Sequence, residues 1–162
     1  MKYDALVFDL DGTLLNSAED IADSLNHVFQ EFDLPTFSLS IYREKIGSGL
    51  SELLENLIPG KLDDELKGRL RTRFHEVYEN YWDKKSTLYD GIAEMLNLVP
   101  NYSQQMAILS NKPEHFTQEI IRQIFSDWEF AWVKGSSKAF PNKPHPDSLT
   151  HFMSSYSCIP ER

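Results

Sequence analysis

The sequence predicts an α/β fold with a parallel sheet, interrupted by a helical insertion after the first strand. An apolar stretch at residues 3–8 ends in an acidic turn, as expected for a strand buried on both faces of a parallel sheet. From about residue 86 onward, short apolar runs alternate with helical patterns, which is typical of a parallel α/β core. Between these parts, residues 16–85 show only helical spacing of apolar residues.

The first strand is expected at Tyr3–Phe8, and a helix begins soon after it. Ser17 and Asp20 have the spacing of a hydroxyl cap with an acid three residues on. Pro35 ends this helix, whose apolar residues follow at helical spacing: Ile21, Leu25, Val28, Phe29 and Phe32. Further helices are predicted over residues 41–45, 50–57 and 63–84.

After the insertion, a turn at Tyr89-Asp90-Gly91 leads into a helix that runs through Val99. The remaining elements are expected in alternation: a strand at 105–109, a helix at 113–125, a strand at 128–133 and a helix from Pro146. The predicted organisation is a Rossmann-like core of residues 1–15 and 86–162, with residues 16–85 as a separate helical domain.

Two aspartates follow the first predicted strand, in the run Asp9-Leu10-Asp11-Gly12-Thr13. Side chains alternate faces along an extended backbone, so Asp9 and Asp11 point the same way if the extension persists. A bound divalent cation would relieve their mutual repulsion, and Gly12 lets the backbone turn close to an anion or metal. The run predicts a nucleophilic aspartate, a second aspartate for proton transfer, and magnesium beside a phosphate. The alternative is an acidic turn, where Asp-Gly is common.

Two later segments carry groups suited to phosphate. Residues 106–109 form an apolar run that ends in Ser110, a neutral hydrogen-bond donor, and Asn111. The segment Asn142-Lys143-Pro144-His145-Pro146 places a compact positive charge beside prolines that fix the local backbone. Each segment alone is typical of an ordinary turn, but in order with the aspartate pair they predict a phosphate site.

These segments resemble, in the same order, motifs of the haloacid dehalogenase superfamily, and specifically of its phosphoglycolate phosphatase-like branch. Residues 9–14 match the pattern Asp-x-Asp-Gly-Thr-Leu without a departure, and residues 143–146 resemble its Lys-Pro-x-Pro element. The resemblance implies that Asp9 attacks phosphorus, while Asp11 protonates the leaving alcohol and later helps to deprotonate water. Dehalogenase members generally lack the second aspartate, so Asp11 favours phosphoryl transfer.

The resemblance also implies the cofactor, the substrate class and the remaining site. Magnesium would be held by the Asp9 carboxylate and the Asp11 backbone carbonyl. The transferring phosphoryl group would be cradled by Gly12, Thr13, Ser110, Asn111 and Lys143. The substrate would be a small phosphorylated metabolite, with phosphoglycolate favoured, and residues 16–85 would be the family's helical cap, which closes over the pocket.

The family's fourth element, a strand ending in a Gly-Asp pair, is expected where the sequence stops at Arg162. We therefore expect a C-terminally truncated, incomplete core in which the first strand, central in the family, becomes an edge. An exposed apolar edge is a template for pairing with another chain, so self-association through the first strand is expected. A portion of a longer protein and a truncated reading frame both remain open.

Composition argues for a globular protein of the cytoplasm. The 162 residues are 41% hydrophobic and 25% charged, and the formal charge of -9 disfavours a nucleic-acid surface. No segment approaches the ~18 to 20 apolar residues that cross a membrane, so no membrane partner is expected. Cys158 is the single cysteine, which indicates a reducing compartment and hence a cytoplasmic location.

The leading prediction is a magnesium-dependent phosphatase that hydrolyses a small phosphate monoester through an aspartyl-phosphate intermediate. A sugar-phosphate mutase of the same branch would carry the same motifs. A catalytically impaired fragment or a non-catalytic remnant of the fold is a third reading. The missing fourth element would deprive the site of a magnesium ligand, and magnesium demands a well-formed oxygen shell. A phospho-receiver module would also use acids, a hydroxyl and a lysine, but the helical insertion does not suit it.

Overall fold

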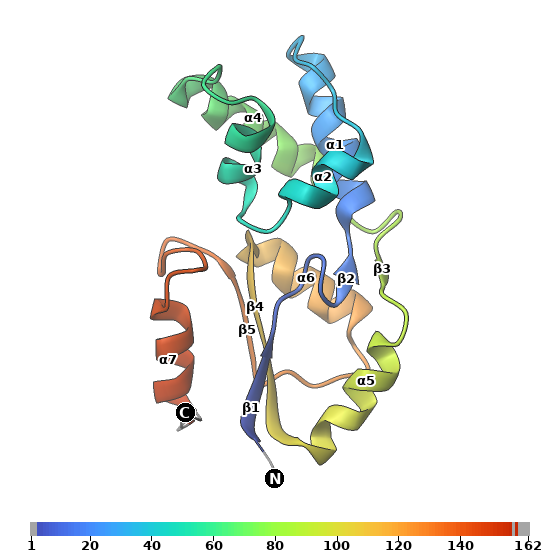
Figure 1. Ribbon diagram of the computed structural model, residues 1–162, viewed down its shortest axis with the longest axis vertical. Coiled ribbons are helices and arrows are strands. Elements are labelled where there is room, and N and C mark those ends of the chain that lie inside the picture. The colour runs from blue at the N-terminus through green and yellow to red at the C-terminus, as the bar shows by residue number, and fades with distance from the viewer. Residues whose placement is uncertain (1–2, 157, 159–162) are drawn as a thin grey trace. The chain divides into compact units, whose positions relative to one another are not determined.

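The computed structural model describes residues 3–156 and residue 158 (Figure 1). Its chain divides into two compact units: residues up to Leu14 together with those from Leu88 onward, and residues Leu15–Thr87. The division falls close to the predicted domain boundaries at residues 15 and 86. Each unit has its own core and is described by itself below.

The first unit is built on a parallel sheet, as predicted. Its strands are β1 (Tyr3–Phe8), β4 (Ser103–Pro113) and β5 (Trp132–Ser136), in the order β1-β4-β5. The central strand β4 is buried from Met106 to Lys112, as expected for a strand with a neighbour on each side. The carboxyl ends of β1 and β4 therefore lie side by side, with Phe8 paired to Ile108.

Helices cover this sheet on two sides (Figure 1). The helix α5 (Ile92–Leu98) continues into a 3-10 turn at Val99–Asn101, and α6 (Glu114–Ile124) packs on β4 and β5. On the other side, α7 (Asp147–Ser155) stacks Phe152 on Trp132 with ring centroids 5.0 Å apart. These helices and the sheet enclose the core of the unit.

The last strand was predicted too early, at residues 128–133. Trp128 instead belongs to a turn after α6, where its backbone N–H donates to the Phe125 carbonyl at 3.1 Å. Its ring packs against Phe125, and its indole N–H donates to Asn97 at 2.9 Å. The aromatic residues that suggested a strand are therefore loop residues packed on the core. The strand β4 is also longer at both ends than the predicted 105–109.

The second unit is all-helical, with α1 (Ala18–Glu31), α2 (Leu39–Lys45), α3 (Leu50–Leu57) and α4 (Asp64–Tyr78). Its core forms mainly between α1 and α4. The fully buried side chains of this unit include Leu25, Phe29, Tyr42, Leu54 and Leu70. The last helix ends at Tyr78 and not near residue 84. Beyond Tyr78 the backbone forms turns with hydrogen bonds between residues three apart, such as Tyr81 N–H to Tyr78 O at 3.0 Å.

The predicted helix start is confirmed, with Ser17 as the N-cap residue of α1, but the Ser17 side chain makes no capping hydrogen bond. The acid of that pattern has another role. Asp20, only 2% exposed, accepts hydrogen bonds from the backbone N–H groups of Lys85 and Ser86 at 2.8 to 3.0 Å. A buried carboxylate needs such donors, and here it joins the two ends of the helical unit.

Two short strands were not predicted. β2 (Leu15–Asn16) and β3 (Thr87–Leu88) pair with each other, and two residues are too few to show a period in the sequence. Within the described residues, no helix is both long and apolar enough to cross a membrane.

Candidate active site

The aspartate pair lies directly after β1, where the chain leaves the sheet. Leu10 is fully buried, and Asp9 and Asp11 on either side of it are partly exposed, so the alternation expected for an extended chain holds here. The chain then turns, with the Leu14 N–H donating to the Leu10 carbonyl at 3.0 Å. Gly12 supplies the positive φ of 80° that this turn requires.

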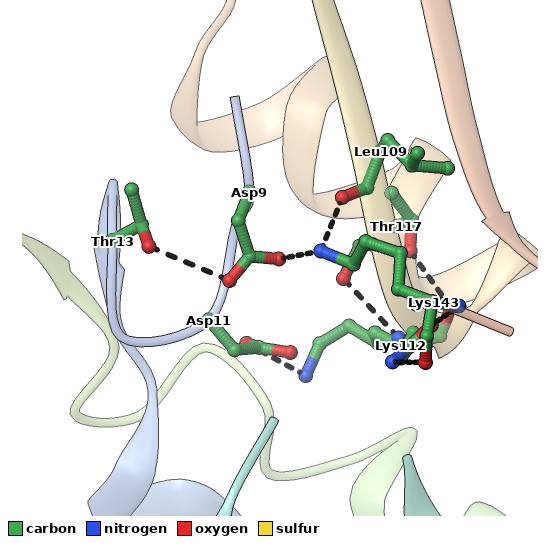
Figure 2. A network of polar contacts seen from close by, with 9 residues as sticks. Asp9, Asp11, Thr13, Leu109, Lys112, Thr117 and Lys143 are labelled. Carbon is green, nitrogen blue, oxygen red and sulfur yellow. Dashed lines mark hydrogen bonds and ion pairs between the residues drawn. The ribbon is translucent and has the colours of Figure 1, made fainter. Parts of the chain in front are cut away.

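Lys143 reaches the first aspartate from far along the chain. Its Nζ lies 2.5 Å from Asp9 Oδ1 and donates to the Leu109 carbonyl oxygen at 2.7 Å. The other oxygen of the Asp9 carboxylate accepts from the Thr13 hydroxyl at 3.4 Å. Figure 2 shows these side chains converging at the ends of the two strands. The lysine thus sits where it can bind both a carboxylate and a phosphoryl oxygen.

Asn111 holds the backbone of Lys143. Its amide oxygen accepts from the Lys143 N–H at 2.8 Å, and its amide nitrogen donates to the Lys143 carbonyl at 3.1 Å. This paired contact fixes the root of the lysine beside β4. The sequence predicted Asn111 as a phosphate ligand; the structure gives its amide this positioning contact.

Ser110 precedes Asn111 on β4 and is 3% exposed. Its hydroxyl oxygen accepts from the Lys112 N–H at 3.1 Å, a bond that does not use the hydroxyl's own proton. Ser110 therefore keeps the donor that was predicted to bind phosphate.

A second lysine, not singled out by the sequence, pairs with the second aspartate. Lys112 Nζ lies 3.0 Å from Asp11 Oδ1, and the two side chains are 4% and 11% exposed. The sequence signal was present but weak, since a lysine at the end of an apolar strand is usually a solvent-facing residue. Figure 2 shows each aspartate with a lysine of its own.

The chemistry of this site suits a magnesium ion and a phosphate. The charges of the two aspartates balance those of the two lysines, so a divalent cation and a phosphate dianion can be added together without a net charge. Among the described residues, no group of three or more His, Cys, Asp or Glu could hold a metal. Magnesium needs no such cage, because one or two carboxylates, water and phosphate oxygens complete its shell. Asp9 and the Asp11 segment offer that donor set.

The predicted site residues therefore lie together in the first unit. Asp9, Asp11, Gly12 and Thr13 form the turn after β1, Ser110 and Asn111 end the buried part of β4, and Lys143 approaches from the loop between β5 and α7. The class that this fold and site define is an α/β enzyme with an aspartate-lysine centre and an inserted helical unit.

Comparison with known proteins gives the family. A model described as haloacid dehalogenase-like hydrolase matches residues 6–162, and the chain belongs to this family. A phosphoglycolate phosphatase of Colwellia psychrerythraea is 30% identical over 167 residues, with 99% of this chain matched to 74% of that protein. The predicted family and the predicted hydrolase class are thereby confirmed.

Solved structures show the same fold. The crystal structure of a predicted phosphoglycolate phosphatase from Haemophilus somnus superposes with a TM-score of 0.82 at 26% identity, covering 97% of this chain and 72% of that one. A haloacid dehalogenase-like hydrolase from Bacteroides fragilis gives a TM-score of 0.88 at 21% identity, covering 99% and 76%. The chain spans about three quarters of the length of each of these relatives.

Proposed function

We propose that this protein is a magnesium-dependent phosphatase that hydrolyses a small phosphate monoester through an aspartyl-phosphate intermediate. The observation that carries the proposal is the contact of Lys143 Nζ with Asp9 Oδ1 at 2.5 Å, with Asp11 two residues further on. A carboxylate beside a lysine is a nucleophile whose attack on a phosphate dianion is not opposed by uncompensated charge. A second carboxylate on the same side of the turn supplies the proton.

In the first step, an Asp9 carboxylate oxygen forms a bond to phosphorus as the bond from phosphorus to the ester oxygen breaks. Asp11, ionised in its pair with Lys112 in the free site, takes up a proton together with the substrate. The leaving oxygen then takes this proton, so an alcohol departs and Asp11 is a carboxylate again. In the second step, water attacks the phosphorus of the aspartyl phosphate and gives a proton to Asp11. Inorganic phosphate leaves, the Asp9 carboxylate is restored, and Asp11 releases its proton to solvent and pairs with Lys112 again.

The remaining residues bind and orient the phosphoryl group. Lys143, the Ser110 hydroxyl, the Thr13 hydroxyl and the backbone at Gly12 are the proposed donors to its oxygens, and Asn111 fixes Lys143. The Asp9 carboxylate and the Asp11 backbone carbonyl would hold Mg²⁺, which would supply charge neutralisation for the phosphate and the nucleophile.

We propose phosphoglycolate, or a phosphorylated metabolite of similar size, as the substrate. The support is the similarity to relatives with the name phosphoglycolate phosphatase in Colwellia psychrerythraea and Pasteurella multocida, each 30% identical. We also propose that the protein acts in the cytoplasm, which its single cysteine supports. Relatives that isomerise sugar phosphates would be separated from it by their products.

The test is hydrolysis of p-nitrophenyl phosphate and 2-phosphoglycolate by the 162-residue chain, with and without magnesium. We expect turnover that chelation with EDTA abolishes and added Mg²⁺ restores. Asp9→Asn should lower kcat by about 10³-fold or more, since the nucleophile is lost. The matched control is Asp127→Asn, the same change at an exposed aspartate of the same unit, which should leave kcat unchanged.

Three results would contradict the proposal. Equal activity of Asp9→Asn and wild type would show that Asp9 is not the nucleophile. No turnover from a chain that circular dichroism shows to be folded would favour the non-catalytic reading of this fold. Release of an isomerised sugar phosphate, without free inorganic phosphate, would identify a mutase instead.

A further inference from the structure

We propose that Lys112 is a positioning residue, which holds the Asp11 carboxyl group in the place from which it protonates the leaving group. This inference rests on the proposed function and deepens it. The observation behind it is the ion pair between Lys112 Nζ and Asp11 Oδ1 at 3.0 Å, in a part of the site with little access to solvent.

The ion pair between Lys112 and Asp11 is buried, unlike a contact between charged side chains at the surface. The side chain of Lys112 is 4% exposed and that of Asp11 is 11% exposed, whereas the ion pairs of Lys84 and Lys85 lie at the surface. A lysine is rarely buried without a partner, because removing its charge from water costs several kcal/mol, on the order of the gain from pairing. A buried ion pair is strongly destabilised when one partner is removed, so Lys112 is placed to hold the Asp11 side chain.

Lys112 is itself held at its backbone. Its N–H donates to the Ser110 hydroxyl at 3.1 Å, and its carbonyl oxygen accepts from the fully buried Thr117 hydroxyl at 3.2 Å. Gly135 of β5 packs closely on the same point, since a Cβ there would lie 2.7 Å from the Lys112 carbonyl oxygen. Neighbouring elements β4, α6 and β5 thus all define the place of this lysine.

The two lysines of the site differ in exposure, and this difference separates their roles. Lys143, on Asp9, has a side chain that is 29% exposed, so an incoming phosphate can reach it. Lys112, whose side chain is 4% exposed, has its Nζ on the Asp11 carboxylate instead. We therefore assign Lys112 an action through Asp11 and no direct contact with substrate.

The consequence is specific to the leaving group. An alkyl alcohol leaves as a strong base and needs a proton in the transition state, whereas p-nitrophenolate is a weak base and leaves without one. General acid catalysis contributes about 10²- to 10⁴-fold where a proton is needed. If the Asp11 carboxyl group is displaced, the hydrolysis of an alkyl phosphate should therefore slow much more than that of p-nitrophenyl phosphate.

The experiment compares kcat for 2-phosphoglycolate and for p-nitrophenyl phosphate in Lys112→Met, a change that keeps most of the length of the side chain and removes its charge. We expect a loss of about 10- to 100-fold with the alkyl ester and of about 3-fold or less with the aryl ester. Lys112→Arg keeps the charge and should recover part of the alkyl activity. Asp11→Asn removes the proton donor altogether, so it gives the largest expected difference between the loss of kcat with the alkyl ester and the loss with the aryl ester.

A matched control is available in the same unit. Lys134 pairs with Glu114 at 2.6 Å and its side chain is 13% exposed, but it does not contact Asp11. Lys134→Met removes a comparable ion pair and should leave the ratio of the two kcat values unchanged. If Lys112→Met fails to fold, Thr117→Val replaces it: this variant removes the hydroxyl bond to the Lys112 carbonyl and should shift the ratio in the same direction.

The outcomes separate this inference from the proposed function. An active wild type whose Lys112→Met variant loses both activities equally, or neither, would overturn the role of Lys112 alone. A wild type inactive on both esters, or an Asp11→Asn variant without leaving-group asymmetry, would overturn the proposed function and this inference with it. A shift of the ratio by Lys134→Met equal to that by Lys112→Met would also overturn the role of Lys112.

Discussion

At the scale of single residues, the site consists of two aspartate-lysine pairs with different surroundings. Asp9 and Lys143 are partly open to solvent, and Asp11 and Lys112 are more enclosed. The charges of the two pairs cancel, so the site attracts neither a cation nor an anion strongly at long range. The formal charge of -9 on the whole chain does not attract a phosphate either. Local contacts therefore decide whether substrate is bound.

Gly135 is the residue on which the packing behind the site depends. A Cβ at this position would lie 2.4 Å from Glu114 Cα and 2.7 Å from the Lys112 carbonyl oxygen, both of them backbone atoms. We predict that Gly135→Ala lowers the free energy of unfolding by about 1–3 kcal/mol, the usual cost of overpacking, and reduces kcat. Urea denaturation followed by circular dichroism measures the first effect.

Gly68 provides the control for that substitution. It lies inside α4, and a Cβ there would meet no atom within 4 Å. Gly68→Ala should stabilise the protein by about 0.5–1 kcal/mol, because alanine is the better helix former. Equal stability changes in the two variants would show that the close approach at Gly135 does not constrain the fold.

At the scale of elements, β1 has the sequence of an inner strand and the surroundings of an edge strand. Its residues from Asp4 to Phe8 are only partly buried, and among the described residues it pairs with β4 alone. The Tyr3 N–H donates to Tyr102 of the β4 side at 2.8 Å. Because residues alternate along a parallel ladder, the backbone groups of Leu6 and Phe8 face the open edge.

We therefore predict that the 162-residue chain self-associates through β1. Light scattering coupled to size-exclusion chromatography should show an average mass that rises with protein concentration. Tyr3→Lys places a charge on the edge at a residue that is already 43% exposed, and it should reduce the association. Tyr81→Lys, at a 52% exposed tyrosine of the helical unit, should not. A wild-type mass that stays monomeric at every concentration would contradict the prediction.

In the helical unit, an ion pair between α1 and α4 links stability to pH. Arg73 binds Glu31 with both prongs of its guanidinium, at 2.7 and 2.9 Å, and this hydrogen bonding holds the pKa of Glu31 below its ordinary value. A pKa that is lower in the folded state adds stability above the unfolded value of about 4.3, and that stability is lost as the pH falls through the folded value.

Glu31→Gln should accordingly lower the melting temperature at pH 7, and the difference from wild type should shrink as the pH falls below about 4. The effect will be small, since both side chains are exposed and solvent screens the pair. Glu79→Gln, at an exposed glutamate just after α4, serves as the control. A difference that stays constant between pH 7 and pH 3 would refute the assignment.

At the scale of the whole molecule, the sequence predicted the features that depend on local patterns. The buried strand at Tyr3–Phe8, the helix at Leu50–Leu57 and the parallel α/β architecture all appear in the structure. The meeting of Asp9 and Lys143 was predicted from the order of the motifs and from the family resemblance, since Lys143 lies in a loop and not at a strand end. Motif order was sufficient for that part of the site.

Tertiary packing determines what the sequence did not predict. The pairing of Lys112 with Asp11 joins residues far apart in the chain, and no local period marks it. The start of β5 was misplaced because the aromatic side chains before it pack as a turn, which strand propensity alone does not distinguish. Similarly, Asp20 was predicted as part of a cap, but its partners at Lys85 and Ser86 come from the other end of the helical unit.

The most direct test of the account is chemical trapping of the phosphorylated aspartate. The chain is mixed with magnesium and 2-phosphoglycolate, quenched during turnover and treated with borohydride, which reduces an acyl phosphate to an alcohol. Peptide mass spectrometry should then find homoserine at position 9, and none when substrate or magnesium is omitted. Hydrolysis of the substrate with an unmodified Asp9 peptide, or with the reduced residue at position 11, would contradict the assignment of Asp9 as the nucleophile.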